Sequence, residues 1–271
     1  MLSVSTSPII ARYLENVPAV TISFWRMCFG AIILWGISLI KKQPPLKNKN
    51  LHQTLIAGIL LGIHFALFFG SIKLTTIANA TFLGTLAPIF TFCIEKFILK
   101  RSHSYILLMG LVFAICGATI IVSNNFDFSS NHTIGNLLAV ACSIFLGAGF
   151  IISENVRKKV DTISFSKTLF STAAFTLFII AFIIDSSLIG YSWENYMGLI
   201  LLGIVPTLLG HGSMYFAIRH VSPTVVAATP MGEPIMASLM AWYLFNESVS
   251  IITIIGGTFT LIGLFLLAKQ K

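Results

Sequence analysis

Long apolar runs separated by short polar turns make up most of this chain. About 20 mainly apolar residues suffice to cross a bilayer, and the runs of roughly that length lie at 19–40, 52–72, 75–98, 104–123, 135–153, 163–184, 196–218, 221–244 and 251–268. Residues 1–14 are apolar or small and polar, and we expect them to form part of one more helix, either a short one or one that begins upstream of Met1. The pattern predicts an all-α, polytopic membrane protein with about ten helices, the first of them truncated.

The composition agrees with a membrane location and excludes a soluble bundle. Hydrophobic residues make up 56% of the chain and charged residues 10%, whereas an ordinary soluble domain carries about 25% charged residues. A soluble helical protein also needs outer helices with one polar face, and almost every run here is apolar on all sides. The lipid bilayer is therefore an expected partner of the protein.

The positions of the basic residues predict how the helices are oriented. Alternate loops contain thirteen of them: Lys41, Lys42, Lys47, Lys49, Lys96, Lys100, Arg101, Arg157, Lys158, Lys159, Arg219, Lys269 and Lys271. The other set of loops contains only Arg12 and Lys73. Because cytoplasmic loops collect Lys and Arg, we expect the C-terminus in the cytoplasm of a cell with this protein in its inner membrane. Basic residues scattered through short turns do not form a nucleic-acid-binding face, despite the net charge of +8.

The chain contains an internal repeat. A shift of 146 residues places Lys73 on Arg219, Pro88 on Pro234, Ser102 on Ser248, Gly110 on Gly256 and Gly117 on Gly263, and the motif TISF occurs at 21–24 and again at 162–165. Five helices per half is an odd number, so the second half must enter the membrane from the opposite side. We predict halves at 1–123 and 135–271, in the inverted arrangement typical of secondary transporters, whose binding sites lie near the midplane between repeats.

Three stretches carry a family resemblance: SPIIARYLENVPAVTISFWRM, NATFLGTLAPIF, and GHGSMYFAIRHVSPTVVAATPMGEPIMASLMAWYLFNES. In their order and doubled spacing they resemble the drug/metabolite transporter superfamily, in particular its EamA-type exporters, over essentially the whole chain. The closing series Pro234, Glu247, Gly256 and Gly263 is similar to the end of each EamA repeat, although Arg101 stands at the position equivalent to Glu247 in the first copy. The resemblance implies an inner-membrane carrier that exports amino acids or related metabolites, or imports small solutes, and is driven by an ion gradient or by simple exchange. The expected mechanism is alternating access between the two halves.

The sequence also suggests residues that bind the solute. Ionisable groups inside a membrane span are costly and default to a functional hypothesis. Glu233 lies between Pro230 and Pro234, and these two prolines, like Pro88 in the first half, should bend their helices and free backbone carbonyls. Glu233 would then hold a substrate amine or a coupling proton; the alternative is a carboxylate that only joins helices.

Arg26, in the second helix, would bind a substrate carboxylate through two hydrogen bonds or extend to the outer interface. His64 and His211 stand one residue apart in the repeat register and would relay protons or contact the solute, or simply pack. Asn79 and Tyr215 are weaker candidates, because hydrogen bonds between helices would explain them equally well. We place Trp25 and Trp242 at the membrane interface, and read one further set of residues as close-packing points between helices: Gly58, Gly62, Gly110, Gly117, Gly256 and Gly263.

No metal or cofactor is predicted, because the four cysteines stand alone in apolar runs and no phosphate-binding loop occurs. The scattered acidic residues offer no catalytic constellation, so we do not expect an enzyme. A secondary carrier of small metabolites is the first hypothesis. An accessory or structural membrane subunit and, behind it, a membrane-embedded enzyme are the alternatives, and a homodimer stays open.

Overall fold

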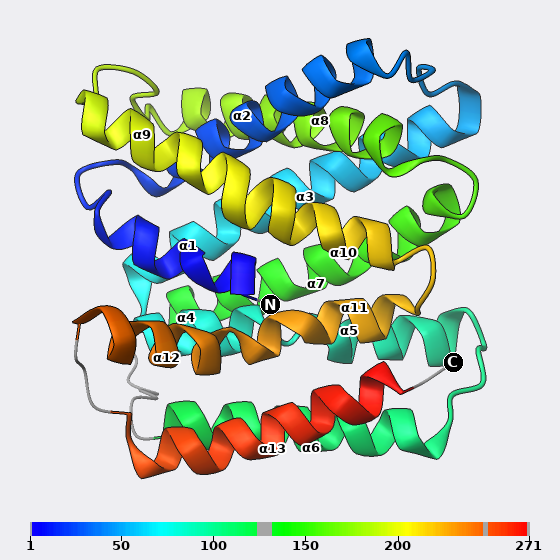
Figure 1. The fold of residues 1–271 in the computed structure, drawn as a ribbon, viewed down its shortest axis with the longest axis vertical. Helices are drawn as coiled ribbons and strands as arrows, with labels where there is room; N and C mark the ends of the chain where they lie inside the picture. The colour runs from blue at the N-terminus through cyan, green and yellow to red at the C-terminus, as the bar shows by residue number, and fades with distance from the viewer. Residues whose placement is uncertain (1, 124–131, 246–248, 270–271) are drawn as a thin grey trace.

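The computed structural model describes residues 2–123, 132–245 and 249–269, and within these ranges it contains helices and no strand. The helices of the first half are α1 (Leu2–Arg12), α2 (Ala19–Ile40), α3 (Asn48–Leu74), α4 (Ile77–Gly84), α5 (Ala87–Cys93), η1 (Ile94–Ile98) and α6 (Tyr105–Val122). Those of the second half are α7 (Thr133–Arg157), α8 (Thr162–Ile183), α9 (Trp193–Leu202), η4 (Gly203–His211), α10 (Gly212–Ala217), α11 (Pro223–Ala228), η5 (Thr229–Gly232), α12 (Glu233–Phe245) and α13 (Ile251–Ala268). Figure 1 shows them lying side by side as one bundle.

The prediction of a polytopic, two-repeat helical fold is confirmed. Within the described ranges, eight helical spans are long and apolar enough to cross a membrane. The predicted span 221–244 corresponds to α11, η5 and α12 in series. The predicted span 135–153 was too short, because α7 continues to Arg157, whose side chain is buried. Glu247 lies outside the described residues.

Several helices, but not all, begin at a short polar side chain that accepts hydrogen bonds from the first free backbone N–H groups. Thr76 accepts from Asn79 at the start of α4, Ser104 from Leu107 at the start of α6, and Asp161 from Ile163 and Ser164 at the start of α8. Such caps satisfy backbone donors that have no partner inside the helix. They explain why the apolar runs turn into helices at the polar residues that precede them.

Two of the predicted spans are broken near their middle. The first, 75–98, is interrupted at Thr85 and Leu86, and Pro88 occupies the first turn of α5. The second is interrupted by the 3-10 turn η5, which carries Pro230 and leads into α12 at Glu233. Proline has no backbone N–H and clashes with the preceding turn, so a straight helix cannot pass through it. The two breaks stand at corresponding places in the 146-residue register.

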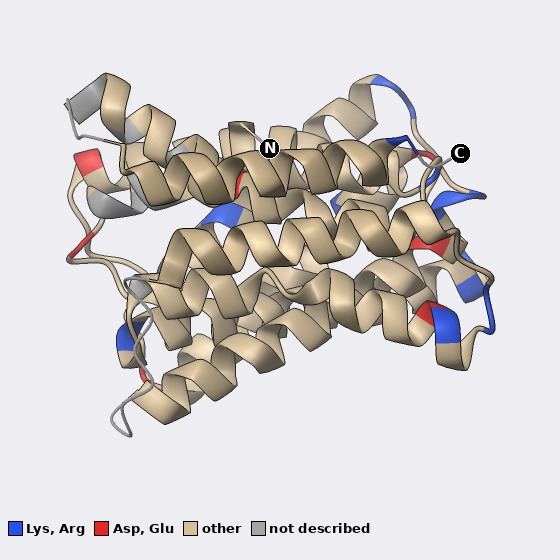
Figure 2. Cartoon of the chain, turned by 90° about the horizontal axis from the view of Figure 1, so that it is seen from below, with Lys and Arg blue, Asp and Glu red and all other residues tan. Residues whose placement is uncertain are grey.

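Nearly all basic residues lie at one end of the bundle, as Figure 2 shows. We call this end the basic end. The α3–α4 and α10–α11 connections, which correspond in the repeat register, lie at opposite ends of the molecule (Figure 1). Helices that correspond in sequence but run in opposite directions are what an inverted repeat requires.

Glycines bring α6 and α13 into backbone contact. A Cβ atom on Gly110 would lie 2.9 Å from the carbonyl oxygen of Gly263, and one on Gly256 would lie 2.6 Å from that of Gly117. Gly110 corresponds to Gly256 and Gly117 to Gly263, so the two contacts exchange under the repeat symmetry. Gly58 makes a similar approach from α3 to α8. Small residues permit this packing, which stabilises helix pairs in a bilayer.

Candidate functional site

A buried cavity lies between the two halves, near the helix breaks. We call it the central cavity. Its volume is about 100 Å³, several times the ~10–15 Å³ that one water molecule needs. Its walls come from α1, α2, α3, α4 and α7 and from the broken segments of the second half, and they consist of Val4, Ser7, Arg26, His64, Phe65, Phe68, Phe69, Ile72, Thr81, Gly84, Thr85, Leu146, His211, Pro230 and Glu233.

Arg26 is the buried cation of the central cavity. Its side chain is only 2% exposed, so it does not extend to the membrane interface. Nε donates to Thr207 Oγ1 at 3.0 Å, and the guanidinium carbon lies 4.5 Å from the centre of the Phe65 ring. Nη2 is buried and has no hydrogen-bond partner among the described residues. The side chain is thus held in place while one of its donors stays available.

The two histidines lie in the same cavity, on either side of Phe65. The Phe65 ring centre is 4.9 Å from that of His64 and 5.2 Å from that of His211. His64 Nδ1 lies 2.9 Å from the carbonyl oxygen of Cys142; because a carbonyl only accepts, this nitrogen carries the proton. His211 Nδ1 is buried and finds no partner in the part of the chain that the structure describes. The two histidines, which stand one residue apart in the repeat register, therefore also share one location in the structure.

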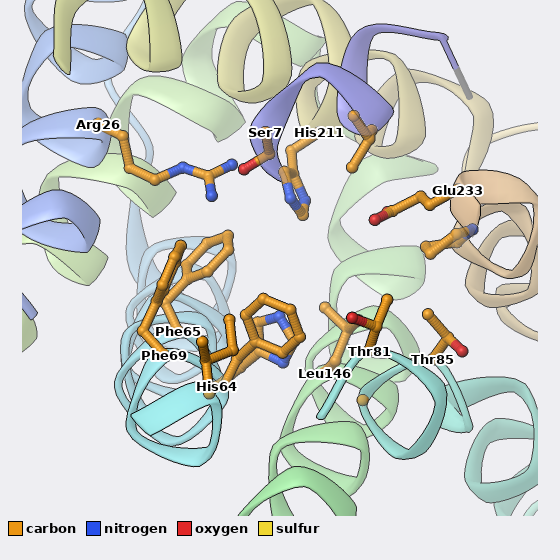
Figure 3. Close-up of a pocket in the computed structure, with 15 residues that line it drawn as sticks. Ser7, Arg26, His64, Phe65, Phe69, Thr81, Thr85, Leu146, His211 and Glu233 are labelled. Atoms are coloured by element: carbon orange, nitrogen blue, oxygen red, sulfur yellow. The ribbon is translucent and has the colours of Figure 1, made fainter. Parts of the chain in front are cut away.

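Glu233 enters the cavity from the other side. It is the first residue of α12 and follows directly on the turn η5, so the helix break points its side chain inward. Figure 3 shows Arg26 on one side of the cavity and Glu233 on the other. A helix N-terminus carries partial positive charge, which suits a carboxylate at this position. The arrangement offers a cationic and an anionic group to one solute.

Asn79 and Tyr215 do not line the cavity. Asn79 donates through Nδ2 to Asn136 Oδ1 at 2.9 Å. Tyr215 is 1% exposed and packs against the rings of Phe150, Phe165 and Phe170. Asn79 thus joins helices through a hydrogen bond, as its alternative reading had it, whereas the contacts of the Tyr215 side chain are ring packing. Trp25 points to the loop before α9, where its Nε1 donates to the carbonyl of Leu188 at 2.7 Å.

Several wall residues were not found from the sequence. Ser7, Thr81 and Thr85 supply hydroxyl groups to the cavity, but short hydroxyl residues occur throughout the apolar runs and carry no distinctive signal. The buried carboxylates Glu95 and Glu154 were also missed, and here a signal existed. Both stand at the ends of apolar runs, where an ionisable group already requires a partner. Neither lines the central cavity.

No group of three or more metal-ligating side chains occurs among the described residues. The polar groups of the central cavity include instead a guanidinium, a carboxyl group, two imidazoles and three hydroxyls that face one space, which suits a small polar solute. Apolar helices of spanning length, packed around such a cavity, define a polytopic membrane transporter.

Comparison with known proteins gives the family. The profile of the EamA-like transporter family matches residues 1–123 and 133–269, so the chain belongs to that family. A protein of Archaeoglobus fulgidus named "Uncharacterized transporter" is 25% identical over 268 residues, which are 95% of this chain and 90% of that protein. The "Uncharacterized transporter YdfC" of Bacillus subtilis is 21% identical over 270 residues, 96% of this chain and 85% of that protein.

A solved structure shares the fold. A protein crystal structure superposes with a TM-score of 0.83 at 16% identity, covering 98% of this chain and 92% of that one. At this level of identity the match concerns the fold alone. The chain is therefore a transporter of the EamA-like family and of the drug/metabolite transporter superfamily, as its sequence led us to expect.

Proposed function

We propose that the protein is a secondary carrier that exports small zwitterionic metabolites of the amino-acid class across the inner membrane by alternating access. The observation that carries this proposal is the central cavity, with Arg26 and Glu233 on opposite sides of one buried space. A zwitterion has the complementary pair of charges.

Arg26 would hold the carboxylate of the solute. Its Nη2 has no partner among the described residues, and an unsatisfied buried donor costs about 1–3 kcal/mol. A carboxylate recovers this cost and adds a charge-assisted hydrogen bond. Glu233 would take the amine or, when the cavity is empty, the coupling proton. The histidines would complete the polar wall.

The orientation and direction follow from separate arguments. The loops at the basic end collect Lys and Arg, and by the positive-inside rule this end, with the C-terminus, faces the cytoplasm. Export is proposed because the sequence resembles EamA-type exporters. A homodimer remains compatible with this proposal and is not needed for it.

Transport by the purified protein in vesicles tests the proposal. Vesicles are loaded with amino acids, sugars or organic cations, and uptake and efflux are followed with and without a pH gradient. We expect saturable movement of a zwitterion, reduced by about 100-fold in Glu233→Gln, because a charge-assisted hydrogen bond worth up to ~3 kcal/mol is lost. Glu194→Gln is the matched control, since Glu194 is exposed outside the cavity.

Three outcomes separate the hypotheses. Saturable transport that survives Glu233→Gln would move the binding role to Arg26 and the histidines. Preference for a solute with a single charge would contradict the zwitterion proposal. Absence of movement for every solute tested, with folded protein in the vesicles, would favour an accessory subunit.

A further inference from the structure

A second polar cluster joins the two halves at the basic end of the bundle. Arg101 donates to Glu95 through Nη1 at 2.7 Å and to Glu154 through Nη2 at 2.8 Å. Lys158 donates to the second oxygen of Glu154 at 2.7 Å, and the hydroxyl of Thr224 donates to the second oxygen of Glu95. We call these five residues the basic-end cluster.

The cluster connects three separate segments of the chain. Glu95 lies in η1 and Arg101 in the following loop, both in the first half. Glu154 lies near the end of α7 and Thr224 in the first turn of α11, both in the second half. Every carboxylate oxygen in the cluster accepts a hydrogen bond, and Glu95 is completely buried. Burying such a group costs several kcal/mol unless it is fully paired, so pairing keeps these segments together.

The cluster borders a hollow of about 550 Å³ at the basic end, which is lined among others by Glu95, Arg101 and Val225. The segment that carries Thr224 and Val225 continues along the chain to Pro230, which lines the central cavity. Ala228 lies between Val225 and Pro230 along the chain, one helical turn beyond Thr224, and is completely buried. The helix α11 packs against α5 of the first half.

The repeat does not reproduce the cluster. The 146-residue register places Ala241 at the position of Glu95 and Glu247 at that of Arg101. The second half thus has no carboxylate corresponding to the buried Glu95. The wall of the central cavity includes Ile72 in the last turn of α3 and Thr81 in α4, the two helices that meet at the α3–α4 connection.

We propose that the basic-end cluster is the closed inner gate of the carrier and that the 550 Å³ hollow is the inner mouth of the solute pathway. This inference rests on the proposed function. To pass solute, the gate must exchange the hydrogen bonds between Glu95, Arg101 and Thr224 for water, which lets α11 move away from α5. Arg101 is the positioning residue, because it alone in the described cluster bridges carboxylates of both halves.

Thiol accessibility tests the gate without any transport measurement. Ala228→Cys is introduced into a variant whose four native cysteines are alanine. A membrane-impermeant maleimide is then applied to the basic end of sealed membrane vesicles. We expect slow alkylation in this background and a roughly tenfold faster rate in Arg101→Gln and in Glu154→Gln, within the roughly 5- to 150-fold range of typical two-state couplings. Arg101→Lys should restore part of the slow rate.

Lys96→Gln is the matched control. Lys96 is exposed, neighbours Glu95 and loses the same charge, so its alkylation rate should stay that of the background. Equal rates in all variants would overturn the gate, even if transport is normal. Faster alkylation in both gate variants without transport of any solute would instead uphold the gate and count against the proposed solute. Glu154→Gln removes the partner of Arg101 in the second half. If Arg101→Gln does not fold, the alkylation rate in Glu154→Gln alone tests the gate.

Discussion

The central cavity and the basic-end cluster are both groups of charged side chains between the same two halves, yet their hydrogen bonding differs. In the cavity, Arg26 Nη2 and His211 Nδ1 have no partner among the described residues. In the cluster, both carboxylates are saturated by Arg101, Lys158 and Thr224. Unpaired buried groups cost stability and leave capacity for a ligand, whereas paired groups hold segments together. The difference suggests binding at the first place and closure at the second.

The charge state of Arg101 agrees with a closing role for the basic-end cluster. Burial lowers the pKa of Arg101, but the hydrogen bonds and charges of Glu154 and Glu95 outweigh burial and raise it. The guanidinium therefore stays charged at every physiological pH. Opening must break its contacts by competition with water, and Arg101 itself does not act as a pH sensor.

The largest effect should come from removing the cation of the central cavity. We expect Arg26→Gln to reduce transport by about 100-fold, because a charged hydrogen bond to the solute is lost. The melting temperature should stay equal or rise, since an incompletely paired buried charge disappears. Transport and thermal unfolding in detergent check both expectations, with the exposed Arg219→Gln as control. A large loss of stability would mean that Arg26 is a structural residue.

Replacing the buried carboxylate of the basic-end cluster should destabilise the protein, whereas replacing Arg26 should not. We expect Glu95→Gln to lower the free energy of unfolding by about 1.5–3 kcal/mol, the range for hydrogen bonds to charged groups. Denaturant unfolding in detergent measures the change. If Glu95→Gln left stability unaltered while Arg26→Gln lowered it, the contrast between the two regions would be lost.

A smaller effect should come from the outer bridge of the cluster. Arg101→Gln and Glu154→Gln, alone and together, should show a coupling energy of roughly 0.5–1 kcal/mol. The Arg101 side chain is 32% exposed, so solvent screens the pair. The double-mutant cycle should shrink as salt is added. A coupling that does not respond to salt would indicate a bridge shielded from water.

The smallest effect should come from Lys158. Its side chain is 54% exposed and pairs with Glu154 one turn away on α7, an arrangement worth about 0.3–0.5 kcal/mol. Lys158→Gln should change stability by no more than this and should leave thiol accessibility at position 228 unaltered. A clear increase in accessibility would contradict this ranking and give Lys158 the same part in closing the gate as Arg101.

Much of the fold could be predicted from the sequence. Helices in a bilayer need long apolar runs, and basic residues gather in alternate loops, so the spans and their directions follow from local composition. The glycines of α6 and α13 were also recognisable, because a stripe of small residues is the usual signature of close helix contact. The helix ends differed by several residues, as at Arg157, because tertiary contacts can bury an arginine that composition assigns to a loop.

The candidate site was only partly predictable. Arg26, His64, His211 and Glu233 stood out because an ionisable group in an apolar run is costly, and the structure brings all four to one cavity. Asn79 and Tyr215 stood out less, because a neutral polar group in an apolar run costs less than an ionised one. In the structure their side chains contact neighbouring helices and do not line the cavity. Whether any of the four binds solute stays a prediction.

The sequence by itself determined the membrane class, the doubled and inverted architecture and the family, because each rests on patterns that repeat along the chain. Only the tertiary structure decided which charges are paired. Glu154 and Arg101 are 53 residues apart, and Thr224 and Glu95 are 129 residues apart. No local pattern relates such positions, because their meeting depends on how α5, α7 and α11 pack. That packing pairs the carboxylates at the basic end, whereas Arg26 Nη2 and His211 Nδ1 in the central cavity have no partner among the described residues.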